Sequence, residues 1–272
     1  SSAKILELIE SQSVPDYNLA DVQSWLGELT SQEGEFSKRF TDFYKKLAGM
    51  VTSIETPVLS SCDLAETLLD MRVLQNQVKF PCKILDIGPG AGRHLVNMFL
   101  NPDLQDSIYV GVESIGLPYA FQNMIASTIC FESERVKFFE YIDYEFARKD
   151  FIEIKDVSPN SIVHVPLWQD NLLPKNYFDL IICNYVLDEV SAEDFHRIAD
   201  IISSCLSNNG TVYCRGAQQR ASLKDLFLYG YGTFHGQDIT KTIISKDMKM
   251  VNCEIIASQL TRSFSRKSSK KN

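Results

Sequence analysis

The 272-residue sequence lacks several features that would place it in a simple class. It has no apolar run approaching the ~20 residues that span a bilayer, no signal-peptide pattern at its start and no internal repeat. Its seven cysteines form no C-x-x-C pair and are spaced irregularly, mostly within apolar runs. We therefore expect buried free thiols, a reducing compartment and a soluble, cytoplasmic protein.

Positive charge is also scarce. The chain has 27 Lys and Arg against 35 Asp and Glu, a net charge of −8, and five of the basic residues fall within 262–271. Binding to nucleic-acid phosphates requires Lys and Arg, so the acidic body argues against a DNA-binding protein. Contact of the basic tail with RNA stays open. A hydrophobic content of 44% is sufficient for a packed core.

The hydrophobic pattern changes near residue 80. Residues 1–80 place apolar side chains at helical spacing, as in Phe36, Phe40 and Phe43, and we expect a helical cap or an oligomerisation region that pairs two copies of the chain. Residues 81–262 alternate β-rich runs with helical stretches, which predicts an α/β domain with a doubly wound, mostly parallel, seven-stranded sheet. Residues 263–272 are expected to be a disordered basic tail. The predicted strands are 83–87, 107–112, 161–165, 178–183, 211–214 and one near 250–256.

One helix is defined with particular clarity. Ser191 is a typical N-cap residue, acidic residues follow in the first turn, and an apolar face runs to Leu206. The pattern predicts that this helix ends at Asn208-Asn209-Gly210.

A glycine-rich turn follows the first predicted strand, in Asp86-Ile87-Gly88-Pro89-Gly90-Ala91-Gly92. Glycines let a backbone approach a ligand closely, and the start of the next helix offers unpaired N–H groups. The dinucleotide pattern G-x-G-x-x-G would require glycine at position 93, which is Arg93, and this argues against an NAD-dependent enzyme. An acid at position 86 suits a ligand with a positive amine and would repel a pyrophosphate.

Glu113 ends the next predicted strand. A carboxylate at this point can accept hydrogen bonds from both hydroxyls of a ribose. The turn, Asp86 and Glu113 together resemble the class I S-adenosylmethionine-dependent methyltransferases, over roughly residues 82–216. The resemblance implies S-adenosylmethionine as cofactor and S-adenosylhomocysteine as product. It places Gly88, Gly90 and Gly92 against the methionine part and Glu113 on the ribose, with Asp86 orienting the loop or the amine.

The resemblance also implies an adenine site after the third strand. Trp168 would stack on the base, and Gln169 or Asp170 would accept from its amino group. The Gly-Asp pair usual in this family is absent here. The fourth strand begins with Phe-Asp, as in the family, and Asn184 and Tyr185 at its end would face the methionine moiety.

Several polar residues follow the fourth and fifth strands, where an acceptor would enter. A hydroxyl acceptor needs a base, and the candidates are Asp188, Glu189 and His235. Their alternative roles are acids at a helix N-terminus and an ordinary loop histidine. The candidate acceptor-binding residues are Arg215, Gln218 and Tyr231, and Arg215 is equally suited to a surface ion pair.

The remaining histidines and the cysteines have no spacing typical of a zinc site, and we predict no metal. A divalent ion held by carboxylates stays open. We expect His94 to cap or pack its helix, and His164 to be a core residue satisfied by hydrogen bonds.

The segment 184–189, the long insertions and the helical first region are similar to bacterial sugar O-methyltransferases of surface-polysaccharide biosynthesis. This resemblance implies a hydroxyl of a sugar or other small hydroxylated molecule as acceptor. Two alternatives stay open: an N-methyltransferase acting on a small molecule or a protein, and a non-catalytic partner subunit with a methyltransferase fold. Amide N-methylation is disfavoured because Tyr185, not proline, follows Asn184.

Overall fold

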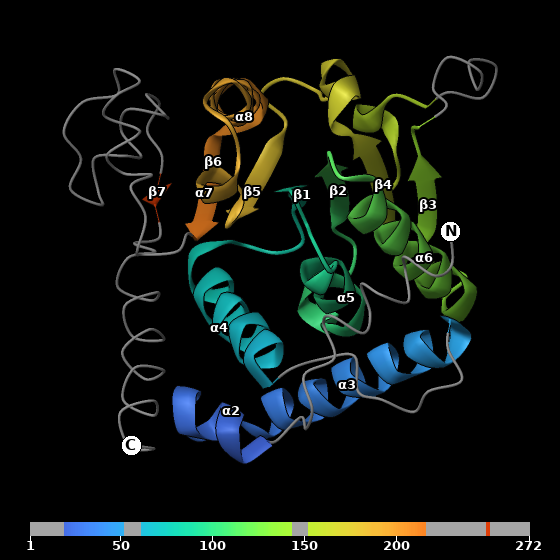
Figure 1. Cartoon of the computed structure of the whole chain (residues 1–272), viewed down its shortest axis with the longest axis vertical. Coiled ribbons are helices and arrows are strands. Elements are labelled where there is room, and N and C mark those ends of the chain that lie inside the picture. Colours follow the sequence, from blue (N-terminus) through green and yellow to red (C-terminus); the bar gives the residue numbers. More distant parts are fainter. Residues whose placement is uncertain (1–18, 52–60, 143–151, 216–248, 251–272) are drawn as a thin grey trace.

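A parallel β-sheet forms the centre of the protein, as seen in a computed structural model that describes residues 19–51, 61–142, 152–215 and 249–250 (Figure 1). Six strands stand in the order β3-β4-β2-β1-β5-β6, and each pair of neighbours is parallel. Their bounds are β1 (Lys83–Ile87), β2 (Ile108–Glu113), β3 (Lys137–Glu140), β4 (Ser161–Pro166), β5 (Phe178–Asn184) and β6 (Leu206–Arg215).

The predicted α/β class and parallel sheet are confirmed. Seven full strands are not, because β7 (Lys249–Met250) is a two-residue strand that pairs with the outer edge of β6. Strand β3 was not expected from the sequence. It lies between the predicted strands 107–112 and 161–165, and it pairs with the edge of β4.

Helices cover both faces of the sheet (Figure 1). One face carries α4 (Ser61–Gln77), α5 (Arg93–Leu100) and α6 (Gly116–Glu132), and the other carries α8 (Ala192–Cys205). Short elements connect them: the 3₁₀ turns η1 (Pro102–Leu104), η2 (Ile154–Asp156) and η3 (Leu167–Leu172), and the helix α7 (Val186–Glu189). None of the helices within the described ranges is long and apolar enough to cross a membrane.

Strand side chains alternate between two hydrophobic cores, as the period of a β-strand requires. Ile84 and Tyr109 enter the core beneath α4, α5 and α6, whereas Leu85 and Val110 enter the core beneath α8. Both faces of the central strands are therefore buried, which accounts for their nearly continuous apolar sequence.

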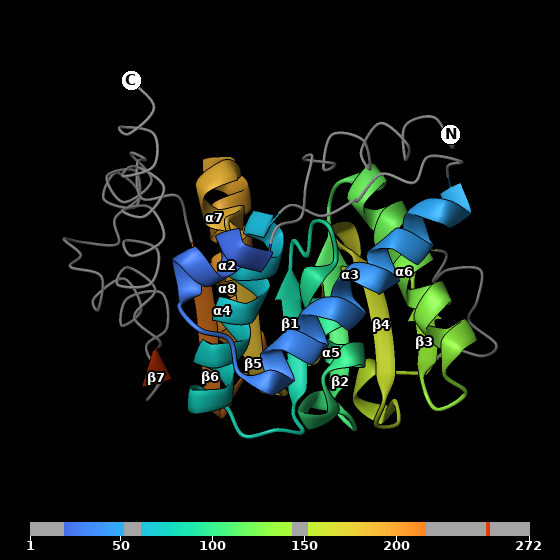
Figure 2. The same ribbon diagram turned by 90° about the horizontal axis from the view of Figure 1, so that it is seen from below.

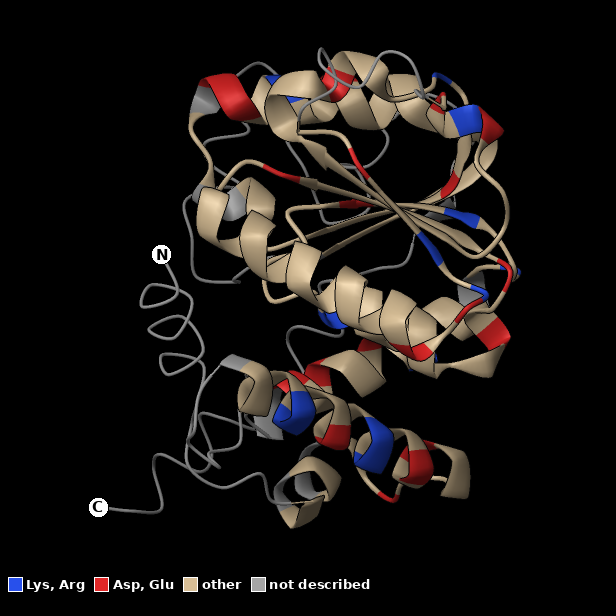
Figure 3. Cartoon of the chain, turned by 90° about the vertical axis from the view of Figure 1, so that its right-hand side faces the viewer, with Lys and Arg blue, Asp and Glu red and all other residues tan. Residues whose placement is uncertain are grey.

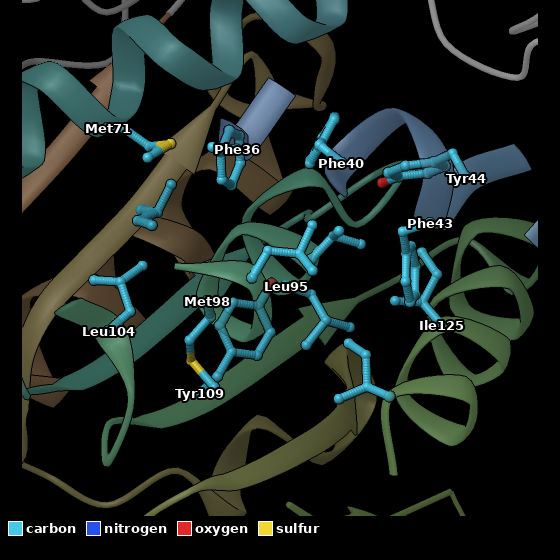
Figure 4. Close-up of a cluster of buried hydrophobic side chains, with 14 of the residues drawn as sticks. Phe36, Phe40, Phe43, Tyr44, Met71, Leu95, Met98, Leu104, Tyr109 and Ile125 are labelled. Atoms are coloured by element: carbon cyan, nitrogen blue, oxygen red, sulfur yellow. The ribbon is translucent and has the colours of Figure 1, made fainter. Parts of the chain in front are cut away.

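The N-terminal helices belong to the first of these cores. Helix α3 (Ser31–Val51) lies across α4 and α5, and α2 (Leu19–Leu26) packs beside α4 (Figures 1 and 2). The predicted stripe Phe36, Phe40 and Phe43 is buried with Leu95 of α5 (Figure 4). Acidic and basic residues are interspersed along the N-terminal helices (Figure 3). A role for the layer in oligomerisation stays a prediction.

Helix α8 begins as the sequence predicts and ends earlier. The Ser191 hydroxyl accepts a hydrogen bond of 3.2 Å from the backbone N–H of Asp194, the contact of an N-cap. The helix ends at Cys205, and Asn208-Asn209-Gly210 lies within β6 rather than at a helix end. The prediction for this helix end was wrong.

The strand order reverses direction at β1. Chain connections lead from β1 outward to β2 on one side, while β5 lies against its other side. In open α/β sheets, ligands bind outside the carboxyl ends of the strands at such a switch point. A ligand site is therefore expected at the ends of β1, β2 and β5.

Candidate cofactor site at the carboxyl edge of the sheet

The glycine-rich turn directly follows β1. Gly88, Gly90 and Gly92 have φ values of 64°, 55° and 71°, a left-handed backbone that glycine adopts without steric cost. A Cβ at Gly88 would lie 2.4 Å from Cγ2 of Val186, and one at Gly92 would lie 2.7 Å from Cδ1 of Ile125. These two glycines are therefore required by packing as well as by backbone geometry.

Gly90 differs from its two neighbours. A Cβ at this position would meet no described atom within 4 Å. The middle of the turn thus presents its backbone to open space, while its two ends are packed against the protein. This is the arrangement that a loop needs when a ligand approaches its backbone.

Glu113 is buried at the end of β2 and holds the start of α6. Its Oε1 accepts hydrogen bonds from the backbone N–H groups of Ser114 and Ile115, at 2.9 and 3.0 Å. Its Oε2 accepts from Nε2 of Gln122 at 3.1 Å, and the same Nε2 donates to the carbonyl of Gly90 at 2.8 Å. Gln122, which the sequence did not single out, therefore connects the acid to the glycine turn.

Asn184 ends β5 beside the glycine turn. Both Nδ2 and Oδ1 of its side chain are buried, and neither has a hydrogen-bond partner in the part of the chain that the structure describes. A buried amide without partners costs free energy of about 1–3 kcal/mol, which a ligand with complementary polar groups can recover. This orphaned amide therefore indicates a binding position.

Tyr185 follows with a left-handed backbone, at φ 65° and ψ −6°. A non-glycine residue in this region carries strain of about 1–3 kcal/mol, and such strain clusters at functional sites. The turn places Val186 against Gly88. Its conformation therefore brings the end of β5 into contact with the glycine turn.

Asp86 lies beneath the turn and is 1% exposed. Its Oδ2 accepts a 2.7 Å hydrogen bond from the Tyr109 hydroxyl and lies 3.1 Å from Nδ1 of His94. These contacts link Asp86 to β2 and to the first residues of α5. Both roles expected for Asp86, orientation of the loop and binding of the amine, stay predictions.

His94 links Asp86 to a second carboxylate, Asp70 of α4, which lies 3.0 Å from Nε2. Burial by itself lowers the pKa of an imidazole, but here Asp86 and Asp70 outweigh burial and raise the pKa of His94 to about 9. The ring is therefore an imidazolium at neutral pH. The expectation that His94 caps or packs its helix understated its role, because the tertiary contact with Asp70 is invisible in the local sequence.

The residues predicted to contact adenine lie in η3, directly after β4. Trp168 is 58% exposed. Nε2 of Gln169 donates to the carbonyl of Tyr141 at 2.9 Å, and Asp170 forms a 2.7 Å ion pair with Arg197. Gln169 and Asp170 thus already have partners in the protein, whereas Trp168 is largely exposed.

His164 of β4 is buried beside this region, stacked on Tyr119 with 3.9 Å between the ring centroids. Its Nδ1 lies 2.5 Å from Oδ1 of Asn123, while Nε2 has no partner among the described residues. Burial lowers the pKa of His164 to about 3, so the ring is neutral. The expected core histidine is found, with one of its two nitrogens satisfied.

Only some of the residues predicted to act as a base or to bind the acceptor lie within the described ranges. Asp188 and Glu189 lie on α7, directly after Tyr185, and Arg215 ends β6 opposite Asn184. Gln218, Tyr231 and His235 lie outside the described residues. Within the described ranges, no group of three or more His, Cys, Asp or Glu side chains could hold a metal ion.

No protein-family model matches the sequence, and no curated protein matches it. Among similar solved structures, a SAM-dependent methyltransferase from Archaeoglobus fulgidus is 16% identical, with 73% of this chain and 67% of that chain covered and a TM-score of 0.35. An arsenic (III) S-adenosylmethionine methyltransferase from Chlamydomonas reinhardtii is 16% identical, with 67% and 51% covered and a TM-score of 0.33. PKMT2 from Rickettsia typhi in complex with AdoHcy is 20% identical, with 59% and 26% covered and a TM-score of 0.31.

The chain thus spans about half of the algal chain and about a quarter of the rickettsial one.

Proposed function

We propose that the chain is an S-adenosylmethionine-dependent methyltransferase. The observation that carries the proposal is the orphaned amide of Asn184, at the same sheet edge as the open face of Gly90 and the buried carboxylate of Glu113. These three groups lie at the carboxyl ends of β5, β1 and β2, the strands that meet at the topological switch point.

Each group has a role that fits one part of this cofactor. Glu113 can accept hydrogen bonds from ribose hydroxyls, since a carboxylate offers more acceptor positions than its present three donors occupy. Gly90 admits the ligand to the loop backbone, and the Asn184 amide can both donate to and accept from the polar methionine end. Trp168 would stack on the adenine. When bound, the cofactor supplies a methyl group activated by its sulfonium.

We propose that the acceptor is a hydroxyl of a sugar or glycan. Asp188 or Glu189 on α7, or His235, would remove the hydroxyl proton, and Arg215, with Gln218 and Tyr231, would orient the acceptor. The backbone supports Arg215 in this role, because register places it opposite Asn184. We place the reaction in the cytoplasm, since the described cysteines are free thiols.

The cofactor assignment is tested by thermal unfolding with S-adenosylhomocysteine. Ligand at about 100 times its Kd stabilises a folded protein by about 2.7 kcal/mol, which raises Tm by several degrees. We expect this increase in the wild-type chain and its loss in Glu113→Ala. The matched control is Glu153→Ala, an exposed acid paired with Lys155, which should retain the increase.

Absence of any Tm increase in the wild-type chain would refute the cofactor assignment. An undiminished increase in Glu113→Ala would refute the ribose role of this residue.

The acceptor is tested by transfer of labelled methyl groups to a panel of sugars, amines and peptides. Transfer to sugar hydroxyls, with a rate that rises as an enzymic base loses its proton, is the expected result. Transfer to amines alone would favour the N-methyltransferase alternative. Cofactor binding without transfer to any acceptor would favour a non-catalytic subunit.

A further inference from the structure

A buried chain of polar side chains connects α4 to the glycine turn through His94. Nε2 of His94 lies 3.0 Å from Oδ2 of Asp70, and Nδ1 lies 3.1 Å from Oδ2 of Asp86. The three side chains are 8%, 0% and 1% exposed, respectively. Tyr213 of β6 extends the chain by donating to Oδ1 of Asp70 at 2.5 Å.

The geometry itself defines the charge of this histidine. Each ring nitrogen faces a carboxylate oxygen, which only accepts hydrogen bonds, whereas a neutral imidazole has a single N–H. With both acids ionised, as the raised pKa of the histidine implies, both contacts are hydrogen bonds only when the ring is protonated. The charged and titratable groups around it come from six elements: Asp70 and Glu66 (α4), Asp86 (β1), Arg93 (α5), Tyr109 (β2), Tyr213 (β6) and Tyr44 (α3).

Helix α4 makes a second, half-buried contact one turn earlier. Glu66 forms a 3.0 Å ion pair with Nη2 of Arg93, the first residue of α5. The other oxygen of Glu66 accepts a hydrogen bond of 3.3 Å from the hydroxyl of Tyr185. The same helix therefore contacts both sides of the candidate site, namely the helix after β1 and the turn after β5.

The start of α5 depends on such tertiary contacts. Its N-cap residue is Gly92, which has no side chain to satisfy the first N–H groups of the helix. Tyr44 of α3 adds a 2.9 Å hydrogen bond to the carbonyl of Ala91. The turn thus takes its position from α3 and α4 as well as from β1.

We infer that α4 is part of the cofactor site, and that Asp70 and Glu66 are positioning residues that hold the glycine turn through His94 and Arg93. The inference rests on the proposed function for its ligand. It assigns to the N-terminal helical region a role in cofactor binding, in addition to the cap or oligomerisation role that its sequence suggests.

A ligand-free measurement tests the positioning role directly. Amide hydrogen exchange over residues 88–95 should be at least about tenfold faster in His94→Gln than in the wild-type chain, since one carboxylate then loses its donor. The matched control is Glu33→Gln, which weakens the 2.5 Å ion pair between α3 and Arg72 of α4 away from the turn. This control should leave exchange at the turn unchanged.

The second measurement is the affinity for S-adenosylhomocysteine as a function of pH. In Asp70→Asn, the new amide can donate to Nε2 while Nδ1–H donates to Asp86, so a neutral ring satisfies both contacts. At about pH 7.5 this variant should bind within about threefold of the wild-type chain, whereas His94→Gln should bind at least tenfold more weakly. Above about pH 9, the wild-type ring loses its second proton and the wild-type affinity should fall relative to that of Asp70→Asn. The quantity to compare is the ratio of the two affinities at each pH, because titration of the ligand affects both proteins equally and cancels in this ratio.

The results that would overturn the inference are specific. One is an amide exchange rate at residues 88–95 that is the same in His94→Gln as in the wild-type chain. The other is an affinity for S-adenosylhomocysteine that depends on pH in Asp70→Asn as it does in the wild-type chain. If His94→Gln does not fold, the Asp70→Asn profile decides the matter. If the wild-type chain does not bind the ligand, the proposed function fails, while the exchange measurement still tests the contact between α4 and the turn.

Discussion

His94 and His164 are both buried on the face of the sheet that α4, α5 and α6 cover, yet their surroundings differ. His94 lies between two carboxylates and is charged, whereas His164 lies between the Tyr119 ring and Asn123 and is neutral. Their pKa values are about 9 and about 3. The glycine-turn side of the site is thus held by buried charge, and the β4 side by ring stacking and a single neutral hydrogen bond.

This difference predicts where the molecule tolerates change. Two buried carboxylates without their cation would each carry a large desolvation penalty, while a neutral ring can be replaced at moderate cost. The same buried charge that fixes the glycine turn makes that turn the more vulnerable region.

The largest expected effect comes from replacing each histidine by leucine. His94→Leu leaves Asp70 and Asp86 buried without their shared cation, and we expect a loss of about 3–5 kcal/mol in the free energy of unfolding. His164→Leu removes one hydrogen bond to Asn123 and should cost about 1 kcal/mol. Urea unfolding measures both, and equal losses would contradict the comparison.

The next effect is on stability as a function of pH. The folded-state pKa of His94 is raised, so its contribution, on the order of 3 kcal/mol, is complete below about pH 6.5 and is lost as pH rises through 9. The pKa of His164 is lowered, so its contribution is complete above about pH 6.5 and is lost as pH falls toward 3.

Unfolding free energies measured between about pH 5 and 10 should therefore decline at both ends. Asp70→Asn should flatten the alkaline decline, and His164→Leu should reduce the acid one. A profile of the wild-type chain without an alkaline decline would show that His94 is not a buried cation.

A smaller effect separates two glycines of the turn. Gly88→Ala adds a Cβ that would lie 2.4 Å from Cγ2 of Val186, in a left-handed backbone. Overpacking and backbone strain together should cost about 2–4 kcal/mol of stability. Gly90→Ala meets no described atom within 4 Å and should cost about 1 kcal/mol.

Affinity for S-adenosylhomocysteine completes the comparison of the two glycines. Gly90→Ala should lower it markedly in spite of the small loss of stability, because its Cβ would occupy the open side of the turn. Unchanged affinity in Gly90→Ala would place the ligand elsewhere.

Local sequence patterns were sufficient to predict the strands around the site. The apolar runs ending at Ile87, Glu113 and Asn184 are strands β1, β2 and β5, and the predicted glycine turn directly follows β1. The strands are visible in the sequence because their apolar pattern extends over a few consecutive residues. The turn is visible because glycine is the residue that tolerates its backbone conformation.

Features set by contacts distant in sequence were not predictable. Asp70 and His94 are 24 residues apart, and nothing in the helical pattern of α4 distinguishes Asp70 from an exposed acid. At Gly210, a Cβ would lie 2.7 Å from Cδ1 of Leu206 and 2.9 Å from the carbonyl oxygen of Phe178. The glycine was read as a helix end, but it serves an irregular strand pairing between β5 and β6.

A calorimetric titration of the full chain with S-adenosylhomocysteine, and separately with NAD, tests the central claim most directly. The claim is that this edge of the sheet binds a nucleoside through Glu113 and its amino-acid arm near Gly90 and Asn184. We predict one molecule of S-adenosylhomocysteine bound per chain, loss of binding in Glu113→Ala and no binding of NAD. Binding of NAD, or no binding of S-adenosylhomocysteine to the wild-type chain, would contradict it.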